Sequence, residues 1–203
     1  MFTGIVQGYC SVVDVAAARN LRRLRVHMPD LMQNLQVGAS VAINGTCLTA
    51  SAVNAEDVEF DVIRETLDNT NLSMLGPGAM VNVERSMQFG DEVGGHILSG
   101  HITARISVCA VHEADNERLL HFAVPTAWMK YLHHKGFIAL DGASLTVAGV
   151  DTAVNQVTVA LIPETIARTS LGVVHTGDWV NLEIDKQTQA IVDTVERTMA
   201  SQE

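Results

Sequence analysis

The sequence predicts an all-β fold made of two tandem copies of one small barrel, followed by a helix. The main observation is a repeat: residues 38–49 recur 97 positions later as residues 135–146, and Val41-Ala-Ile-Asn-Gly45 matches Ile138-Ala-Leu-Asp-Gly142. A period near half of the 203 residues indicates a duplicated unit. Short apolar runs separated by Gly and Asn turns fill both halves, and residues 186–203 have no counterpart in the first half.

Within the first half, alternation and turn residues define the elements. Asn44-Gly45 predicts a hairpin turn, and residues 58–62 alternate apolar and polar side chains, as in a half-buried strand. The expected elements are strands at 4–16, 21–27, 37–43, 47–53, 58–62 and 80–84, and a short helix at 63–72. About six short strands fit a small closed barrel or a sandwich, and closure is favoured because it removes unpaired sheet edges.

The second half repeats this order. Residues 98–102 match 2–6, 157–161 match 58–62, and 180–183 match 81–84. Glycines 90, 94, 95 and 100 mark a boundary at about residues 86–97. We therefore expect a first barrel at 1–90, a second barrel at 97–186 and a helix at 187–203.

The C-terminal segment predicts an amphipathic helix. It lacks Gly and Pro and carries an apolar stripe at Ile191, Val195 and Met199, with Val192 beside it. Such a stripe packs either on the barrels or on copies of the same chain, and we favour an oligomerisation helix.

Composition excludes several functions. The net charge of −10 argues against nucleic-acid binding, which needs a basic surface. No apolar run approaches the length of about 20 residues that a membrane span needs. The N-terminus lacks the features of a signal peptide, and three scattered cysteines indicate reduced thiols in the cytoplasm.

Several motifs carry a family resemblance over essentially the whole chain. They are Met1-Phe-Thr-Gly-Ile-Val6, Asn44-Gly-Thr-Cys-Leu-Thr49, Gly94-Gly-His-Ile-Leu-Ser-Gly-His101, residues 135–146 and Ile162-Pro-Glu-Thr165. Together they closely resemble the riboflavin synthase family. The resemblance implies two six-stranded Greek-key barrels, a C-terminal helix and a homotrimer in which the N-terminal barrel of one subunit faces the C-terminal barrel of its neighbour.

The resemblance also implies an activity. Two molecules of 6,7-dimethyl-8-ribityllumazine dismutate, one giving a four-carbon unit to the other, to form riboflavin and 5-amino-6-ribitylaminouracil. No metal or organic cofactor is expected. The resemblance leaves open whether a lumazine synthase shell encloses the protein.

Residues kept in both halves are expected to bind what the two substrate molecules share. Gly4 and Gly100 allow close backbone approach, while Thr49, Thr146, Glu65 and Glu164 offer hydrogen bonds to a ring or ribityl chain; turn and capping roles are the alternative. The family resemblance further implies that residues 61–66 and 160–165 line the pockets, partly through backbone N–H and C=O groups. The candidate substrate-binding residues are Gly4, Ile5, Val6, Cys47, Leu48, Thr49, Asp61, Val62, Ile63, Arg64, Glu65, Thr66, Gly100, His101, Ile102, Lys135, Ser144, Leu145, Thr146, Ala160, Leu161, Ile162, Pro163, Glu164 and Thr165.

The reaction is asymmetric, so catalytic groups should include positions where the halves differ. The differing pairs are Cys47 and Ser144, Ile5 and His101, Asn44 and Asp141, Gly38 and Lys135, Ser40 and Phe137, and Ser86 and Asp185. The candidate catalytic residues are Ser40, Cys47, His101, Lys135, Asp141, Ser144 and Asp185.

Their hypothesised roles follow from the chemistry. His101 suits removal of a proton from the 7-methyl group, because its pKa lies near neutrality. Cys47 or Ser144, or a water that they position, could add to C7, and the sequence does not decide which. Lys135, Asp141 and Asp185 would set the local charge.

Other interpretations are weaker. His96 and His101 do not have a recognisable zinc spacing, and the glycine cluster does not form a dinucleotide-binding motif. A non-catalytic lumazine or flavin carrier, like the luminescence antenna proteins, is the main alternative function. A protein-binding β-module is a third.

Overall fold

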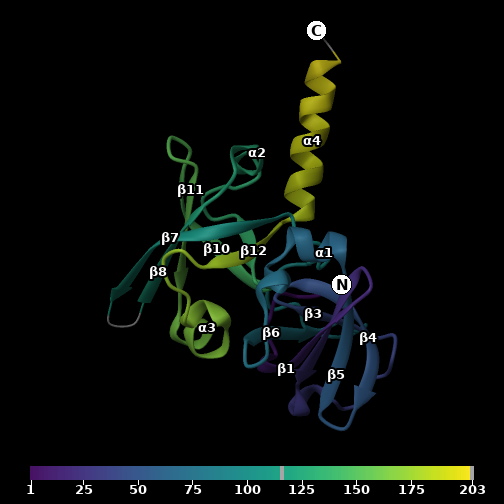
Figure 1. Ribbon diagram of the computed structural model, residues 1–203. Helices are drawn as coiled ribbons and strands as arrows, with labels where there is room; N and C mark the ends of the chain where they lie inside the picture. Colours follow the sequence, from purple (N-terminus) through teal and green to yellow (C-terminus); the bar gives the residue numbers. More distant parts are fainter. Residues whose placement is uncertain (115–116, 202–203) are drawn as a thin grey trace.

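A computed structural model describes residues 1–114 and 117–201. It confirms the predicted architecture: two closed six-stranded antiparallel barrels lie in tandem, and a C-terminal helix, α4 (Lys186–Ala200), projects from the second (Figure 1). Residues 202 and 203, which the predicted helix includes, lie outside the described residues, as do residues 115 and 116 of the second barrel.

The first barrel closes in the spatial order β1-β2-β5-β4-β3-β6. Because β3, β4 and β5 are consecutive neighbours and β6 returns to pair with β3, the connectivity is a Greek key. Its elements are β1 (Gly8–Ala18), β2 (Leu21–His27), β3 (Ser40–Ile43), β4 (Thr46–Asn54), β5 (Asp57–Ile63) and β6 (Met80–Arg85), with short helices η1 (Pro29–Leu31), α1 (Arg64–Asn69) and η2 (Asn71–Met74).

The second barrel has the same connectivity, in the order β7-β8-β11-β10-β9-β12. Its elements are β7 (Ala104–Ala114), β8 (Glu117–Ala123), β9 (Phe137–Leu140), β10 (Ala143–Asp151), β11 (Gln156–Leu161) and β12 (Trp179–Ile184), with helices α2 (Thr126–Met129), α3 (Pro163–Arg168) and η3 (Ser170–Gly172). Each barrel encloses its own apolar core.

Local sequence explains these elements. In β5, Val58, Phe60 and Val62 are fully buried, so the predicted alternation points its apolar members into the barrel. Asn44 and Gly45 both have positive φ, at 44° and 76°, as a two-residue hairpin between twisted strands requires. The equivalent turn in the second barrel is built from Asp141 and Gly142.

The two hairpin turns meet between the barrels. A Cβ atom on Gly45 would lie 2.6 Å from the backbone nitrogen of Gly142, so neither position accommodates a side chain without movement. Close to this contact, Phe2 and Leu98 form an antiparallel bridge and pack with Ala42 and Ala139.

Two leading segments, residues 2–7 and 98–103, cross between the barrels. The Glu84 carboxylate accepts hydrogen bonds from the backbone nitrogens of Thr3 and Gly4, at 2.6 and 3.1 Å, which anchors the first segment to its own barrel. The Gly4 carbonyl then accepts from the Ser144 nitrogen of the other barrel at 2.8 Å. The first segment is therefore held on its own barrel and contacts the other barrel at Gly4, before Gln7 returns it to the first barrel by donating its backbone nitrogen to the Val83 carbonyl.

The second leading segment makes the mirrored set of contacts. Glu183 accepts from the backbone nitrogens of Ser99 and Gly100, at 2.8 and 3.1 Å, and the Gly100 carbonyl accepts from Cys47 at 2.8 Å.

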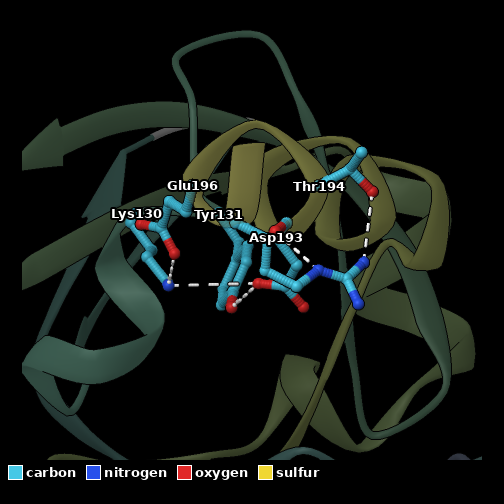
Figure 2. Close-up of polar contacts among 6 residues, drawn as sticks. Lys130, Tyr131, Asp193, Thr194 and Glu196 are labelled. Carbon is cyan, nitrogen blue, oxygen red and sulfur yellow. Dashed lines mark hydrogen bonds and ion pairs between the residues drawn. The ribbon is translucent and has the colours of Figure 1, made fainter. Parts of the chain in front are cut away.

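Helix α4 is anchored at its base. Asp185 caps its N-terminus, accepting from the backbone nitrogen of Thr188 at 3.0 Å. On the side facing the barrel, Tyr131 donates to Asp193, and Lys130 pairs with Glu196 (Figure 2). None of the helices within residues 1–114 and 117–201 has both the length and the apolar character needed to cross a lipid bilayer.

Candidate functional site

A cavity of about 530 Å³ lies beside the second barrel, where the first leading segment crosses it. This volume is within the range of pockets that hold small organic ligands. Its lining comes from three places: the first leading segment, the start of β10 and the α3 region. The lining residues are Gly4, Ile5, Val6, Gln7, Ala143, Ser144, Ile162, Glu164, Thr165, Arg168 and Thr169.

Ser144 is the half-buried hydroxyl at this cavity. Its position depends on glycine, since a Cβ on Gly4 would lie 2.5 Å from the Ser144 Cβ and one on Gly95 would lie 2.7 Å from it. The Ser144 Oγ lies 2.6 Å from the Nδ1 of His96. His96 is 7% exposed, and its ring stacks on Phe137 with centroids 4.9 Å apart.

Cys47 occupies the equivalent place on the first barrel. A Cβ on Gly100 would lie 2.5 Å from the Cys47 Cβ, which is also the distance between a Cβ on Gly4 and the Ser144 Cβ. The thiol is free and half-buried, and His101, next to Gly100, is exposed. The structure therefore places Gly100, the neighbour of His101, against Cys47, while Ile5, the counterpart of His101 in the repeat, lines the same cavity as Ser144.

The other binding candidates divide by the direction of their side chains. Leu48, Leu145, Val62 and Leu161 point into the barrel cores, so only their backbone groups remain for a ligand. Thr49 and Thr146 are exposed, while Ile102 and Ala160 are half-buried. Ile63, Arg64, Glu65 and Thr66 start α1 just as Ile162, Pro163, Glu164 and Thr165 start α3.

Two of the acidic binding candidates, Asp61 and Glu164, form ion pairs with arginines. Asp61 forms a two-point pair with Arg23 on the barrel exterior, at 2.7 and 3.0 Å. This pairing lowers the pKa of Asp61. Glu164, on the cavity wall, pairs with Arg168 one turn later in α3.

The structure places Asp141 between the barrels rather than on the cavity wall. It is 3% exposed and accepts hydrogen bonds from the Asn71 side chain at 2.9 Å and from the Asn181 backbone at 2.8 Å. Burial raises the pKa of Asp141 to about 7, although these hydrogen bonds oppose the change. The expectation that Asp141 sets the charge around the substrate is not matched by this location.

Asp185, Lys135 and Ser40 have other settings. The Asp185 carboxylate caps α4. Burial raises the pKa of Asp185, but hydrogen bonds from Thr188 and Gln187, together with the charge that His96 carries when protonated, lower this pKa overall. Lys135 is exposed and has a positive φ of 64°. Ser40 begins β3 and pairs with Thr49 across the hairpin.

His96 is the residue that sequence reasoning missed. The sequence draws attention to it only as an unsupported metal ligand, because its contact with Ser144 joins positions 48 residues apart. The signal that could have found it is Gly94-Gly95 directly before it, since adjacent glycines often allow close backbone approach. No group of three or more His, Cys, Asp or Glu side chains within the described ranges is placed to hold a metal ion.

Comparison with known proteins decides the family. The lumazine binding domain matches twice, at residues 3–86 and 99–185. The riboflavin synthase of Escherichia coli (strain K12) is 48% identical over 205 residues, covering 100% of this chain and 95% of the relative. The chain belongs to the riboflavin synthase family. Another member, from Chlamydia pneumoniae, is 40% identical over 202 residues, covering 99% of this chain and 98% of the relative.

Solved structures confirm the fold of this family member. LumP complexed with 6,7-dimethyl-8-(1'-D-ribityl) lumazine superposes with a TM-score of 0.82 at 22% identity, covering 92% of this chain and 100% of that chain. LumP complexed with riboflavin gives a TM-score of 0.85 at 23% identity, with the same coverage.

Proposed function

We propose that this chain catalyses the riboflavin synthase reaction. It is a transferase that converts two molecules of 6,7-dimethyl-8-ribityllumazine into riboflavin and 5-amino-6-ribitylaminouracil by moving a four-carbon unit. The observation that carries this proposal is the duplicated site: Cys47 and Ser144, each held against a glycine of a leading segment, occupy equivalent places on two similar barrels. Membership of the family over the full chain supports it.

Each barrel binds one substrate molecule. On the second barrel, the ring and ribityl chain occupy the cavity between Ile5, Val6 and Thr165. On the first barrel, the equivalent place lies between the second leading segment and residues 63–66. Because Leu48, Val62 and their counterparts face the cores, recognition there uses backbone N–H and C=O groups.

The chemical roles are divided between the sites. His101 takes a proton from the 7-methyl group of the substrate on the first barrel, where it lies exposed beside Gly100 and Cys47. The Cys47 thiol and the Ser144 hydroxyl polarise and position the two rings. The catalytic set also includes Lys135, Ser40 and Asp185. Asp141 acts indirectly, through the buried hydrogen bonds that it makes between the two barrels.

The family resemblance implies a homotrimer in which the N-terminal barrel of one subunit faces the C-terminal barrel of the next, so that the two rings meet across a subunit boundary. The support is α4, whose apolar stripe is uncovered: Ile191, Val195 and Met199 are 65, 52 and 66% exposed. A cytoplasmic location fits the three cysteines, all of which are free.

Incubation of the purified full-length chain with 6,7-dimethyl-8-ribityllumazine tests the function. We expect riboflavin and 5-amino-6-ribitylaminouracil to appear in equal amounts, with two lumazine molecules consumed for each riboflavin. A stable fluorescent complex without turnover would instead indicate a carrier, and failure to bind the lumazine would indicate a protein-binding module. Either result would refute the proposal.

A further inference from the structure

We propose that His96 is a positioning residue that holds and orients the Ser144 hydroxyl, and that this makes the second-barrel site chemically different from the first. The inference rests on the proposed function, since it assigns work within that reaction. It concerns a residue that the repeat does not reveal and that the catalytic candidates do not include.

The first step is the contact itself. The Nδ1 of His96 lies 2.6 Å from the Ser144 Oγ, which is within hydrogen-bond distance. The other ring nitrogen, Nε2, is buried and has no hydrogen-bond partner among the described residues. Leaving a buried polar atom unpaired is unfavourable, and such atoms in native proteins call for an explanation in function or in a partner that binds there.

The imidazole is also fixed in place. It stacks on Phe137 at an interplanar angle of 16°, and its backbone nitrogen donates to the Thr3 carbonyl at 3.1 Å. Gly95 makes this possible, because a Cβ there would lie 2.2 Å from the Thr3 oxygen and 2.9 Å from the Ser144 Oγ. A ring held on one face, at its backbone and at Nδ1 restricts the orientation of the hydroxyl that it contacts.

Burial determines the protonation state of this ring. It lowers the pKa of His96 below the ordinary value of about 6.5, and the nearby charge of Asp185 opposes this only in part. The imidazole is therefore neutral at pH 7, and Nδ1 can accept the Ser144 hydrogen. In the tautomer that carries its proton on Nε2, the Ser144 hydrogen is directed at Nδ1 and the Ser144 oxygen presents its lone pairs to the cavity.

The first-barrel site lacks this arrangement. Cys47 takes the place of Ser144, and Ser40 takes the place of Phe137, so the aromatic support for an imidazole is missing. Within residues 1–114 and 117–201, no side chain hydrogen-bonds to the Cys47 thiol, which contrasts with the His96 contact at Ser144. Two identical substrate molecules would thus meet an oriented hydroxyl in one site and an unsupported thiol in the other.

A double-mutant cycle on the full-length enzyme tests this proposal. His96→Gln is measured alone, with Ser144→Ala and with Cys47→Ala, using riboflavin formation to obtain kcat and KM. We expect His96→Gln alone to lower kcat about 10- to 100-fold with little change in KM, a smaller loss than the roughly 100- to 10,000-fold contributed by a group that itself transfers a proton. With Ser144→Ala the further loss should be below about 2-fold, because interacting residues are not additive, while with Cys47→Ala the full loss should persist.

A conservative replacement adds a readout that folding defects would not reproduce. An Asn side chain can place a polar atom near the position of Nδ1, whereas Gln reaches toward the position of Nε2. His96→Asn should therefore retain more activity than His96→Gln, although both replace the ring with an amide. Equal losses from His96→Gln in all three backgrounds, or a better rescue by Gln than by Asn, would overturn the proposal.

A measurement without turnover separates this inference from the function. In nitrogen NMR spectra of the histidine-labelled protein, the His96 ring signals should move on Ser144→Ala and stay in place on Cys47→Ala. Unmoved signals on Ser144→Ala would refute the pairing even in an active enzyme. If the parent protein makes no riboflavin, the proposed function is wrong, and the ring signals still report whether His96 holds Ser144.

Discussion

Lys135 adopts a backbone conformation that its residue type disfavours. Its φ is 64°, in the left-handed region, and its counterpart in the first barrel is Gly38, at 91°. Both residues make the same contact, donating their backbone nitrogens to Val147 and Ala50 at 2.9 and 2.8 Å. Because glycine suits this turn and lysine does not, the exposed Lys135 side chain is retained at a cost, which supports a role in the reaction.

Replacing Lys135 by glycine should therefore separate stability from activity. We expect Lys135→Gly to change the free energy of unfolding by no more than about 1 kcal/mol, because relief of backbone strain offsets the added flexibility of the unfolded chain. The rate of riboflavin formation should fall at least about 10-fold if the ammonium group assists the reaction. Urea unfolding and steady-state kinetics provide the two measurements.

Asn20 offers a matched control for this substitution. It has a φ of 63° in the turn between β1 and β2, so Asn20→Gly makes the same backbone change at a position that we assign no role. The free energy of unfolding and the rate of riboflavin formation of Asn20→Gly should both stay close to those of the parent protein. Full activity in Lys135→Gly would show that the ammonium group is dispensable.

At the scale of elements, α4 has two faces with different partners. One face contacts its own barrel through Val192, Asp193 and Glu196, which meet the core, Tyr131 and Lys130 respectively. The helix periodicity then turns Ile191, Val195 and Met199 to the adjoining face, away from these contacts. The docking therefore leaves the stripe uncovered and available for the contact between subunits that we propose.

Introducing a charge into this stripe should break the assembly. Val195→Glu places a carboxylate where helices of different subunits would pack, and an unpaired buried charge is strongly unfavourable. In sedimentation velocity, we expect the mass to fall from three chains to one, with loss of turnover because each site loses its opposing barrel. Ala190→Glu, on the opposite face of α4, should leave the trimer intact. A trimeric Val195→Glu variant would contradict this role for the stripe.

At the scale of the whole molecule, a buried polar network joins the barrels with near two-fold symmetry. Asn181 donates to the Asn44 carbonyl at 2.8 Å, and Asn82 donates to the Asp141 carbonyl at 2.9 Å. Asp141 breaks this symmetry, because it is a carboxylic acid where the first barrel has Asn44. The hydrogen-bond partners of its carboxylate are Asn71, Ser170 and Asn181, and none of them is a cation.

The raised pKa of Asp141 gives stability a defined pH dependence. The folded state binds this proton with a pKa of about 7, against an ordinary value of about 3.9 in the unfolded chain. Its contribution is therefore fully present below the unfolded pKa and is lost as the pH rises toward 7. Asp141→Asn, which restores the residue type of the first barrel, should remove this loss.

Asp141→Asn and the parent protein should therefore differ most in stability at alkaline pH. Relative to the parent, Asp141→Asn should gain free energy of unfolding on the order of 2–4 kcal/mol between pH 4 and pH 8. Urea unfolding at both pH values measures this change. Asp185→Asn is the contrasting control: the pKa of Asp185 is lowered, so its contribution is present above the unfolded pKa, and its removal should destabilise the protein at pH 8. A constant difference between Asp141→Asn and the parent would show that Asp141 does not titrate in this way.

Much of the fold could be predicted because its signals are local. Alternation in residues 58–62, the Asn44-Gly45 turn and the stripe of α4 each depend on neighbours within a few positions, and the structure has a strand, a hairpin turn and a helix there. The places of Cys47 and Ser144 could also be inferred, since a duplicated sequence puts equivalent residues at equivalent points on two barrels. The surroundings of those residues could not, because they come from distant parts of the chain.

The sequence by itself determined that the molecule is a duplicated barrel with a helical extension, since repeats and periodicity are written along the chain. Only the tertiary structure decided that Gly4 packs against Ser144 and Gly100 against Cys47. These contacts are fixed by hydrogen bonds between residues far apart in sequence. It also decided that Asp141 is buried in the polar network between the barrels and that His96 contacts Ser144. Burial and long-range contact set these properties, and neither can be read from a residue and its neighbours.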